Sequence, residues 1–173
     1  MKKLEKDRLK TLLEIIGTNP SIEIAHFSSG GEELIEALHD YCSSKGYLYQ
    51  INAVDKLFYE NLKKWFKDIS KTTLIDNFQL ERKSYMKHAK QYNYIFVSIE
   101  IEDDFQDDFL KRVHKIILNA GNIIIFIPKG DTKKRYSLIA SLEESYFVAT
   151  SVIDDMFENY DIIISKKMHG WGS

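Results

Sequence analysis

The pattern of hydrophobic and polar positions along this chain predicts alternating strands and helices, most clearly in residues Tyr92–Ile127. Within this stretch, Tyr94–Val97 and Ile123–Ile127 are continuous apolar runs, typical of parallel strands covered on both faces. Apolar residues recur at helical spacing between them, at Phe105, Phe109, Leu110, Val113, Ile116 and Ile117. We expect Gly121 to end this helix in a left-handed conformation. A strand–helix–strand unit of this length predicts a parallel βαβ crossover.

The same pattern extends over the rest of the chain. Further strands are expected at Ile22–Phe27, Tyr47–Ile51, Thr72–Ile75, Phe147–Ile153 and Asp161–Ser165. Amphipathic helices are expected at residues 1–17, around Leu34–Cys42, after Asp55 as the N-cap, and at Tyr136–Glu144. Leu80–Lys90 is also expected to be helical, although its pattern is weak. The link between the last two strands is too short for a helical crossover, which predicts antiparallel neighbours.

Size and composition indicate a single domain spanning residues 1–173, with no sign of a nucleic-acid or membrane protein. A hydrophobic share of 44% is sufficient for a packed core, and a net charge of -2 provides no general attraction to phosphates. Cys42 is the only cysteine, which excludes a disulfide framework and a zinc site built from several thiolates. Acidic residues interrupt the N-terminal amphipathic helix, so it does not read as a signal peptide, and no apolar run approaches the roughly 18 residues of a membrane span. We expect a soluble cytoplasmic protein.

Three features carry a resemblance to a known family. They are the strand at Tyr92–Val97, the turn Asn119–Asn122 before the next strand, and the final pair FVATSVID and YDIIISKK. From about Ile22 onward the chain resembles the class I S-adenosylmethionine-dependent methyltransferase superfamily. The resemblance implies a three-layer, Rossmann-like α/β fold. Its mostly parallel seven-stranded sheet would have the order 3-2-1-4-5-7-6, with the last strand antiparallel.

The resemblance implies a site for S-adenosylmethionine beyond the carboxyl ends of the strands, where ligands bind in open α/β sheets. In the family, the first strand carries an acid followed by a glycine-rich turn, E/D-x-G-x-G-x-G. Aligning Glu23 with the acid places other residues, including Phe27, at the glycine positions, and Gly30 and Gly31 lie just beyond. Two interpretations of Ser28–Gly31 remain open: a variant, degenerate cofactor loop, or an ordinary turn from strand to helix.

The loops after the second and third strands supply the remaining cofactor candidates. In the family, an acid after the second strand holds the ribose, and Asn52 falls at that place. Asp55 could substitute for it, but its residue type and position also suit a helix cap. Asp76 and Asn77 fall where the family often has an acid near the adenine, although such residues are also common in turns.

His26 and Ser98 lie where a ligand or methyl acceptor would meet the sheet edge. His26 could face a ligand or could be a partly buried histidine bonded to the backbone. Ser98 follows the fourth strand and precedes an acidic stretch. Within this stretch Glu100 with Asp103 or Asp104 could bind a divalent metal, but carboxylates before a helix are also favoured by its dipole. We therefore assign no metal ligand, and no residue stands out as a catalytic base.

Two functions are consistent with these patterns. The first is an S-adenosylmethionine-dependent methyltransferase that acts on an unidentified small molecule. The second is a catalytically inactive protein of this fold that binds or scaffolds a protein partner, such as a second copy in a homodimer. A nicotinamide-dependent oxidoreductase is disfavoured because no G-x-G-x-x-G follows a strand. Trp171, near the chain end, is expected to pack on the domain or a partner, and the balanced charge disfavours a contact with RNA.

Overall fold

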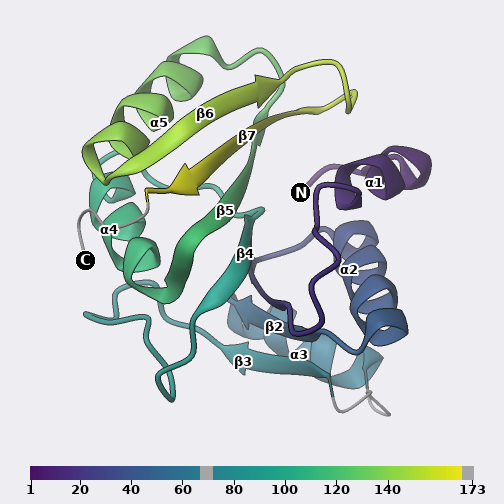
Figure 1. The fold of residues 1–173 in the computed structure, drawn as a ribbon. Helices are drawn as coiled ribbons and strands as arrows, with labels where there is room; N and C mark the ends of the chain where they lie inside the picture. Colours follow the sequence, from purple (N-terminus) through teal and green to yellow (C-terminus); the bar gives the residue numbers. More distant parts are fainter. Residues whose placement is uncertain (67–71, 169–173) are drawn as a thin grey trace.

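A seven-stranded sheet forms the centre of the molecule (Figure 1). The computed structural model describes residues 1–66 and 72–168, so Ile69 and Trp171 lie outside the described part. The strands are β1 Glu23–Ser28, β2 Leu48–Ala53, β3 Thr73–Asn77, β4 Tyr92–Val97, β5 Ile117–Pro128, β6 Phe147–Ile153 and β7 Tyr160–Lys167. Their order is β3-β2-β1-β4-β5-β7-β6, and β7 runs antiparallel to both β5 and β6. The predicted strand order and reversed last strand are confirmed.

Helices cover both faces of the sheet (Figure 1). They are α1 Lys6–Leu13, α2 Glu32–Lys45, α3 Lys56–Trp65, α4 Gln106–Ile116 and α5 Thr132–Glu144. Apolar side chains of α1, α2 and α3 share one core with residues of β1 and β2. Those of α4 and α5 share a second core on the opposite face. The result is the predicted three-layer α/β arrangement.

β1 is buried on both faces because it lies between these two cores. Ile24 belongs to the core under α1–α3, whereas Ala25 and Phe27 belong to the core under α4 and α5. The Phe27 ring contacts three other aromatic rings at centroid distances of 5.2–5.6 Å, those of Phe78, Tyr85 and Phe109. Phe27 is therefore a core residue of the α4–α5 side.

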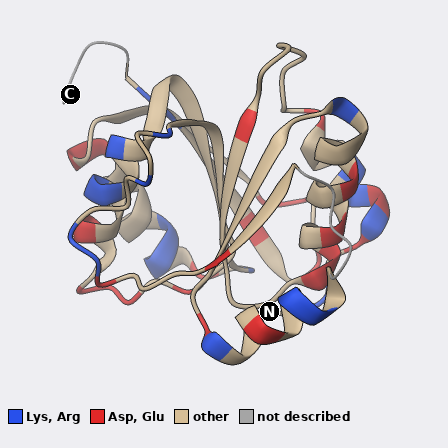
Figure 2. Ribbon diagram, turned by 90° about the horizontal axis from the view of Figure 1, so that it is seen from below, with Lys and Arg blue, Asp and Glu red and all other residues tan. Residues whose placement is uncertain are grey.

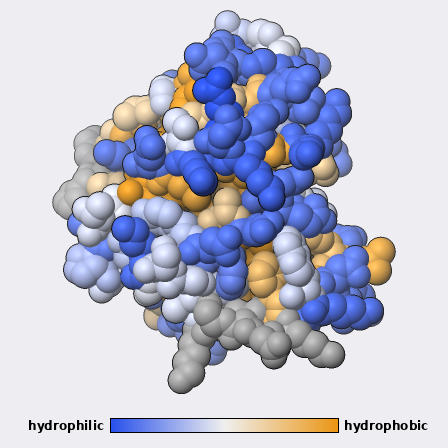
Figure 3. Space-filling model, turned by 90° about the vertical axis from the view of Figure 1, so that its right-hand side faces the viewer, coloured by the Kyte–Doolittle hydropathy of each residue, from blue (hydrophilic) through white to orange (hydrophobic). Residues whose placement is uncertain are grey.

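The N-terminal helix packs on the chain itself. Leu9, Leu12 and Leu13 of α1 are buried in the same core as the apolar face of α2. The apolar stripe that predicted this helix is thus used against α2 and the sheet. On the side of the molecule that carries α1 and α2, hydrophilic surface surrounds smaller hydrophobic areas (Figure 3).

The helix predicted at Leu80–Lys90 is wrong, because this crossover from β3 to β4 has no regular helix. Tyr85 is buried in the aromatic cluster, and its hydroxyl donates to the Leu80 carbonyl at 2.8 Å. His88 and Ala89 have positive φ angles of 54° and 56°, which a helix cannot accommodate. One buried aromatic side chain, rather than a periodic stripe, fixes this loop to the core.

Gly121 does not end α4, contrary to the prediction. The helix ends at Ile116, and the chain enters β5 directly at Ile117. Gly121 lies inside β5, beside an irregularity in the pairing with β4. A Cβ atom there would lie 2.7 Å from Cγ1 of Ile117 and 2.8 Å from the Leu118 carbonyl oxygen. The position requires glycine because of close packing.

Substituting Gly121 with alanine is expected to destabilise the fold by about 1–3 kcal/mol, the usual cost of overpacking a tight site. Denaturant unfolding followed by circular dichroism measures this cost. Gly17→Ala is the control, because a Cβ at Gly17 would meet only the Tyr94 hydroxyl, at 3.4 Å. Equal stability of the two variants would contradict the packing argument.

Candidate functional site

The carboxyl ends of four neighbouring parallel strands meet at one edge of the sheet. In the strand register, Ser28 at the end of β1 pairs with Ala53 of β2, and Ala53 pairs with Asn77 of β3. On the other side of β1, Phe27 pairs with Val97 at the end of β4. The loops after these strands are therefore neighbours, and this is the edge at which open α/β sheets bind ligands.

Glu23 does not lie at this edge. It is the first residue of β1, at the amino edge, where its N–H donates to Asn93 Oδ1 at 2.9 Å. The whole length of β1 separates Glu23 from Gly30. The structure thus places Glu23 apart from the other candidate residues.

The turn after β1 is tightly organised. Ser28 is fully buried, and its hydroxyl donates to the Gly30 carbonyl at 2.5 Å and accepts from the Gly30 N–H at 3.3 Å. Gly31, with φ of 80°, is the N-cap of α2 and provides no side-chain cap. Met1 lies against this turn, because its Sδ would be 2.7 Å from a Cβ at Gly31. The surface left free by the two glycines is thus covered by Met1.

Asn52 and Asp76 are joined through a third side chain, although the sequence placed them in separate loops. β2 extends through Asn52, which is buried, and Asn52 pairs with Asp76 in β3. Gln50 Nε2 donates to Asn52 Oδ1 at 3.3 Å and to Asp76 Oδ2 at 2.8 Å. Lys87 pairs with the same Asp76 oxygen at 2.5 Å. Gln50 and Lys87 were not predicted, since their roles depend on strand pairing and on the irregular loop.

Asp55 and Asn77 are exposed at the same edge. Asp55 caps α3, and its Oδ2 accepts from the Phe58 N–H at 2.9 Å, which confirms the predicted N-cap. Its second carboxylate oxygen is not used by that bond. Asn77 is the last residue of β3 rather than part of a turn.

His26 is fully buried and bonds two side chains. Its Nδ1 lies 2.7 Å from the Tyr49 hydroxyl, and its Nε2 lies 2.7 Å from Ser98 Oγ. Burial lowers the pKa of His26 to about 3, so the ring is neutral at physiological pH. Both ring nitrogens of His26 are thus occupied by side-chain partners rather than by backbone atoms. Tyr49 was missed because a buried strand tyrosine gives no sequence signal of its partner.

A cavity of about 670 Å³ opens beside Ser98. Its lining comes from Met1, Ser29, the acidic stretch after β4, the end of β5, the start of α5 and Tyr160. Lys134 connects α5 to the acidic stretch, since its Nζ bonds Asp103 Oδ1 at 2.8 Å and the Ile101 carbonyl at 2.5 Å. Within residues 1–66 and 72–168, no three His, Cys, Asp or Glu side chains are grouped to hold a metal.

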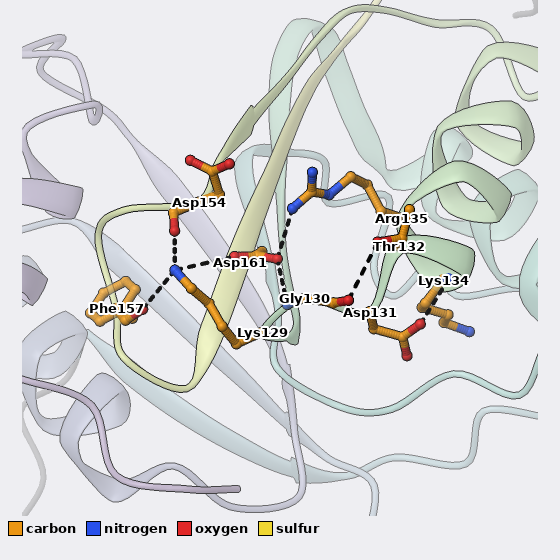
Figure 4. A network of polar contacts seen from close by, with 9 residues as sticks. All are labelled: Lys129, Gly130, Asp131, Thr132, Lys134, Arg135, Asp154, Phe157 and Asp161. Atoms are coloured by element: carbon orange, nitrogen blue, oxygen red, sulfur yellow. Dashed lines mark hydrogen bonds and ion pairs between the residues drawn. The ribbon is translucent and has the colours of Figure 1, made fainter.

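A buried carboxylate holds the cavity wall in place (Figure 4). Asp161 of β7 accepts from the Gly130 N–H at 3.0 Å and from Arg135 Nη2 at 2.9 Å. Lys129 Nζ lies 3.5 Å from Asp161 Oδ1 and also bonds backbone carbonyls of the β6–β7 link. Burial alone would raise the pKa of Asp161, but these donors hold it below its usual value. The β5–α5 turn is thereby fixed to the final hairpin.

Strand order, the reversed β7 and two helical layers define the class I S-adenosylmethionine-dependent methyltransferase fold. Acidic and basic residues both occur on helices of the two layers (Figure 2). Across the part of the chain that the structure describes, no helix has the length and apolar character needed to cross a membrane.

Solved structures of methyltransferases share this fold. The tRNA (m1A58) methyltransferase TrmI of Aquifex aeolicus matches with a TM-score of 0.68 at 16% identity, over 94% of this chain and 68% of its own. The N-methyltransferase NodS of Bradyrhizobium japonicum matches with a TM-score of 0.68 at 12% identity, over 94% of this chain and 96% of its own. Human N-acetylserotonin methyltransferase, solved with S-adenosylmethionine, matches with a TM-score of 0.68 at 12% identity, over 93% of this chain and 52% of its own. No family model matches the chain, and no curated protein does. At such identities the similarity shows the fold.

The low pKa of His26 is expected to make stability depend on pH. Between the ordinary pKa of 6.5 and the folded-state value of about 3, the unfolded chain binds a proton that the folded chain does not. This contribution is complete above pH 6.5 and is lost as the pH falls, with a slope of about 1.4 kcal/mol per pH unit. The measurement is the free energy of unfolding in urea at several pH values from about 4.5 to 7.5.

His26→Gln should lower that slope relative to the wild type. His88 is exposed, and His88→Asn serves as the control that should retain the wild-type slope. His114 is also buried, and its pKa is lowered to about 4. Its contribution to the pH dependence is the same in the wild type and in both variants. Parallel curves for wild type and His26→Gln would contradict the buried neutral state of His26.

Proposed function

We propose that this protein is an S-adenosylmethionine-dependent methyltransferase that acts on a small molecule. The observation that carries the proposal is the adjacency of two features at one sheet edge. The Ser28–Gly31 turn follows β1 at the carboxyl edge, where the resemblance implies a cofactor, and Ser29 of this turn also lines the cavity beside Ser98. A cofactor on the turn and an acceptor in the cavity would therefore be neighbours.

The residues at the edge fit the chemical groups of this cofactor. Gly30 has no side chain, and a Cβ there would meet only Met1, so a ligand that displaces Met1 can approach the backbone. Asp76 and Asp55 offer carboxylate oxygens that can accept from ribose hydroxyls or an amino group. Gln50 orients the Asp76 carboxylate by donating to it, and the same Gln50 nitrogen also donates to Asn52. When bound, S-adenosylmethionine supplies an electrophilic methyl group.

The chain itself would mainly align the acceptor and exclude water. Ser98 is the polar group at the cavity side nearest the sheet, and its hydroxyl is fixed by His26. Carboxylates outnumber the two lysines of the lining, Lys133 and Lys134, and so disfavour phosphate; they are Glu100, Glu102, Asp103, Asp104 and Asp131. This charge favours an uncharged or cationic small molecule over RNA, whereas the Aquifex aeolicus neighbour is a tRNA methyltransferase.

The second candidate is an inactive protein of the same fold that binds a protein partner. Specific contacts favour it. Met1 occupies the surface of Gly31, and the Lys2 N–H donates to the Tyr160 hydroxyl at 2.5 Å, which holds the N-terminal segment over the edge. Asp76 is already paired with Lys87. A cofactor must displace Met1 to reach the turn, whereas a scaffold would keep these contacts.

Calorimetric titration with S-adenosylmethionine and S-adenosylhomocysteine tests the proposal. We expect micromolar binding, weakened at least about tenfold by Asp76→Ala, because a lost hydrogen bond to a charged group costs about 1.5–3 kcal/mol. Gly30→Val should weaken binding similarly by blocking the approach to the backbone. Tyr136→Ala is the control, since Tyr136 is 69% exposed on α5 and does not line the cavity.

Absence of heat at millimolar ligand, from wild-type protein shown to be folded, would overturn the enzyme proposal. That result would support the inactive candidate. Binding that is unaffected by both Asp76→Ala and Gly30→Val would overturn the placement of the cofactor at this edge.

A further inference from the structure

Three side chains, from neighbouring strands of the sheet, form a hydrogen-bonded chain that ends at the cavity. Tyr49 comes from β2, His26 from β1, and Ser98 directly follows β4. The two hydrogen bonds that connect them are both 2.7 Å long. Tyr49 and His26 are fully buried, whereas Ser98 is partly exposed and lines the cavity. The inner end of the chain is thus sealed in protein and the outer end meets the cavity.

The buried phenol fixes the direction of these bonds. Among the described residues, the Tyr49 hydroxyl bonds only His26 Nδ1. If Nδ1 carried the imidazole proton, the phenol proton would have no acceptor in a dry interior, which is costly. Tyr49 therefore donates to Nδ1, and the neutral ring carries its one proton on Nε2. That Nε2–H donates to Ser98 Oγ.

The Ser98 hydroxyl proton is then left for another acceptor. The Phe27 carbonyl oxygen lies 3.4 Å from Ser98 Oγ, at the long limit of a hydrogen bond, and it already accepts the Ser98 N–H at 3.0 Å. A ligand oxygen in the cavity would be a better acceptor. With Ser98 as a donor, this arrangement also differs from a nucleophilic triad, in which the imidazole accepts the serine proton and a carboxylate orients the ring.

We infer that the Tyr49–His26–Ser98 chain makes Ser98 a hydrogen-bond donor to an uncharged oxygen, such as a carbonyl or amide oxygen, of the ligand that occupies the cavity. An anionic oxygen is disfavoured by the cavity lining, whose two cations, Lys133 and Lys134, are outnumbered by carboxylates, and Lys134 is already bonded to Asp103. The carboxylates are those of Glu100, Glu102, Asp103, Asp104 and Asp131. The inference deepens the proposed function. It rests on that function only where it identifies this ligand as the methyl acceptor. Ser98 contacts the ligand, and His26 and Tyr49 are positioning residues.

Nitrogen-15 NMR of histidine-labelled protein tests the direction of the chain without any ligand. The expected spectrum shows His26 as the Nε2–H tautomer near neutral pH. Tyr49→Phe removes the donor to Nδ1 and should raise the share of the Nδ1–H form. Tyr47→Phe is the matched control, a buried tyrosine of the same region, and should leave the tautomer unchanged. A wild-type Nδ1–H tautomer would overturn the inference.

Small probes test the ligand class on the same samples. Acetamide supplies an uncharged carbonyl oxygen, acetate an anionic one, and methylammonium no acceptor. We expect acetamide to shift the His26 Nε2–H and Ser98 amide signals saturably. Ser98→Ala should weaken this binding by about three- to tenfold, the usual effect of one hydrogen bond.

Acetate binding as tight as acetamide, or a His26 Nε2–H shift from methylammonium equal to that from acetamide, would overturn the ligand assignment. So would acetamide signals that do not move up to molar concentration. None of these measurements requires S-adenosylmethionine. Failure of cofactor binding therefore overturns the proposed function alone, and the wrong tautomer or probe preference overturns the inference alone.

Discussion

The pairing of β1 with both β2 and β4 is the constraint on which the rest of the structure depends. Because both faces of β1 are buried, a slip of one residue would move His26 into the core under α4 and α5 and Phe27 into the opposite core. The register that satisfies both cores also aligns the carboxyl ends of the strands. It brings Tyr49 and Ser98 to the two nitrogens of His26. Core packing thus determines the geometry of the candidate site.

The sequence predicted the architecture well because continuous apolar strands and amphipathic helices are local, periodic signals. It failed where one long-range contact decides the structure. The buried Tyr85 fixes residues 80–90 as an irregular loop, and close packing rather than helix termination explains Gly121. Strand ends were also placed too early, since β2 and β3 continue through Asn52 and Asp76 as paired strands. Periodicity does not report how far neighbouring strands stay paired.

The sequence predicted individual residues of the candidate site but not the contacts between them. Ser98 and His26 were identified from their places after and within strands, whereas Tyr49 needed the register. Glu23 was aligned from an acidic residue type, but the structure places it at the amino edge.

The hydrogen bonds of His26 to Tyr49 and Ser98 bear on whether the edge serves a ligand or only the fold. A buried polar chain is costly unless every member is satisfied, and an apolar core would be no less stable. This one ends on Ser98, whose Oγ lies 3.4 Å from a carbonyl oxygen that is already bonded, beside a cavity of about 670 Å³. The Ser98 hydroxyl is therefore available to a ligand in the cavity, which is also lined by Met1, the residue that covers the glycine turn.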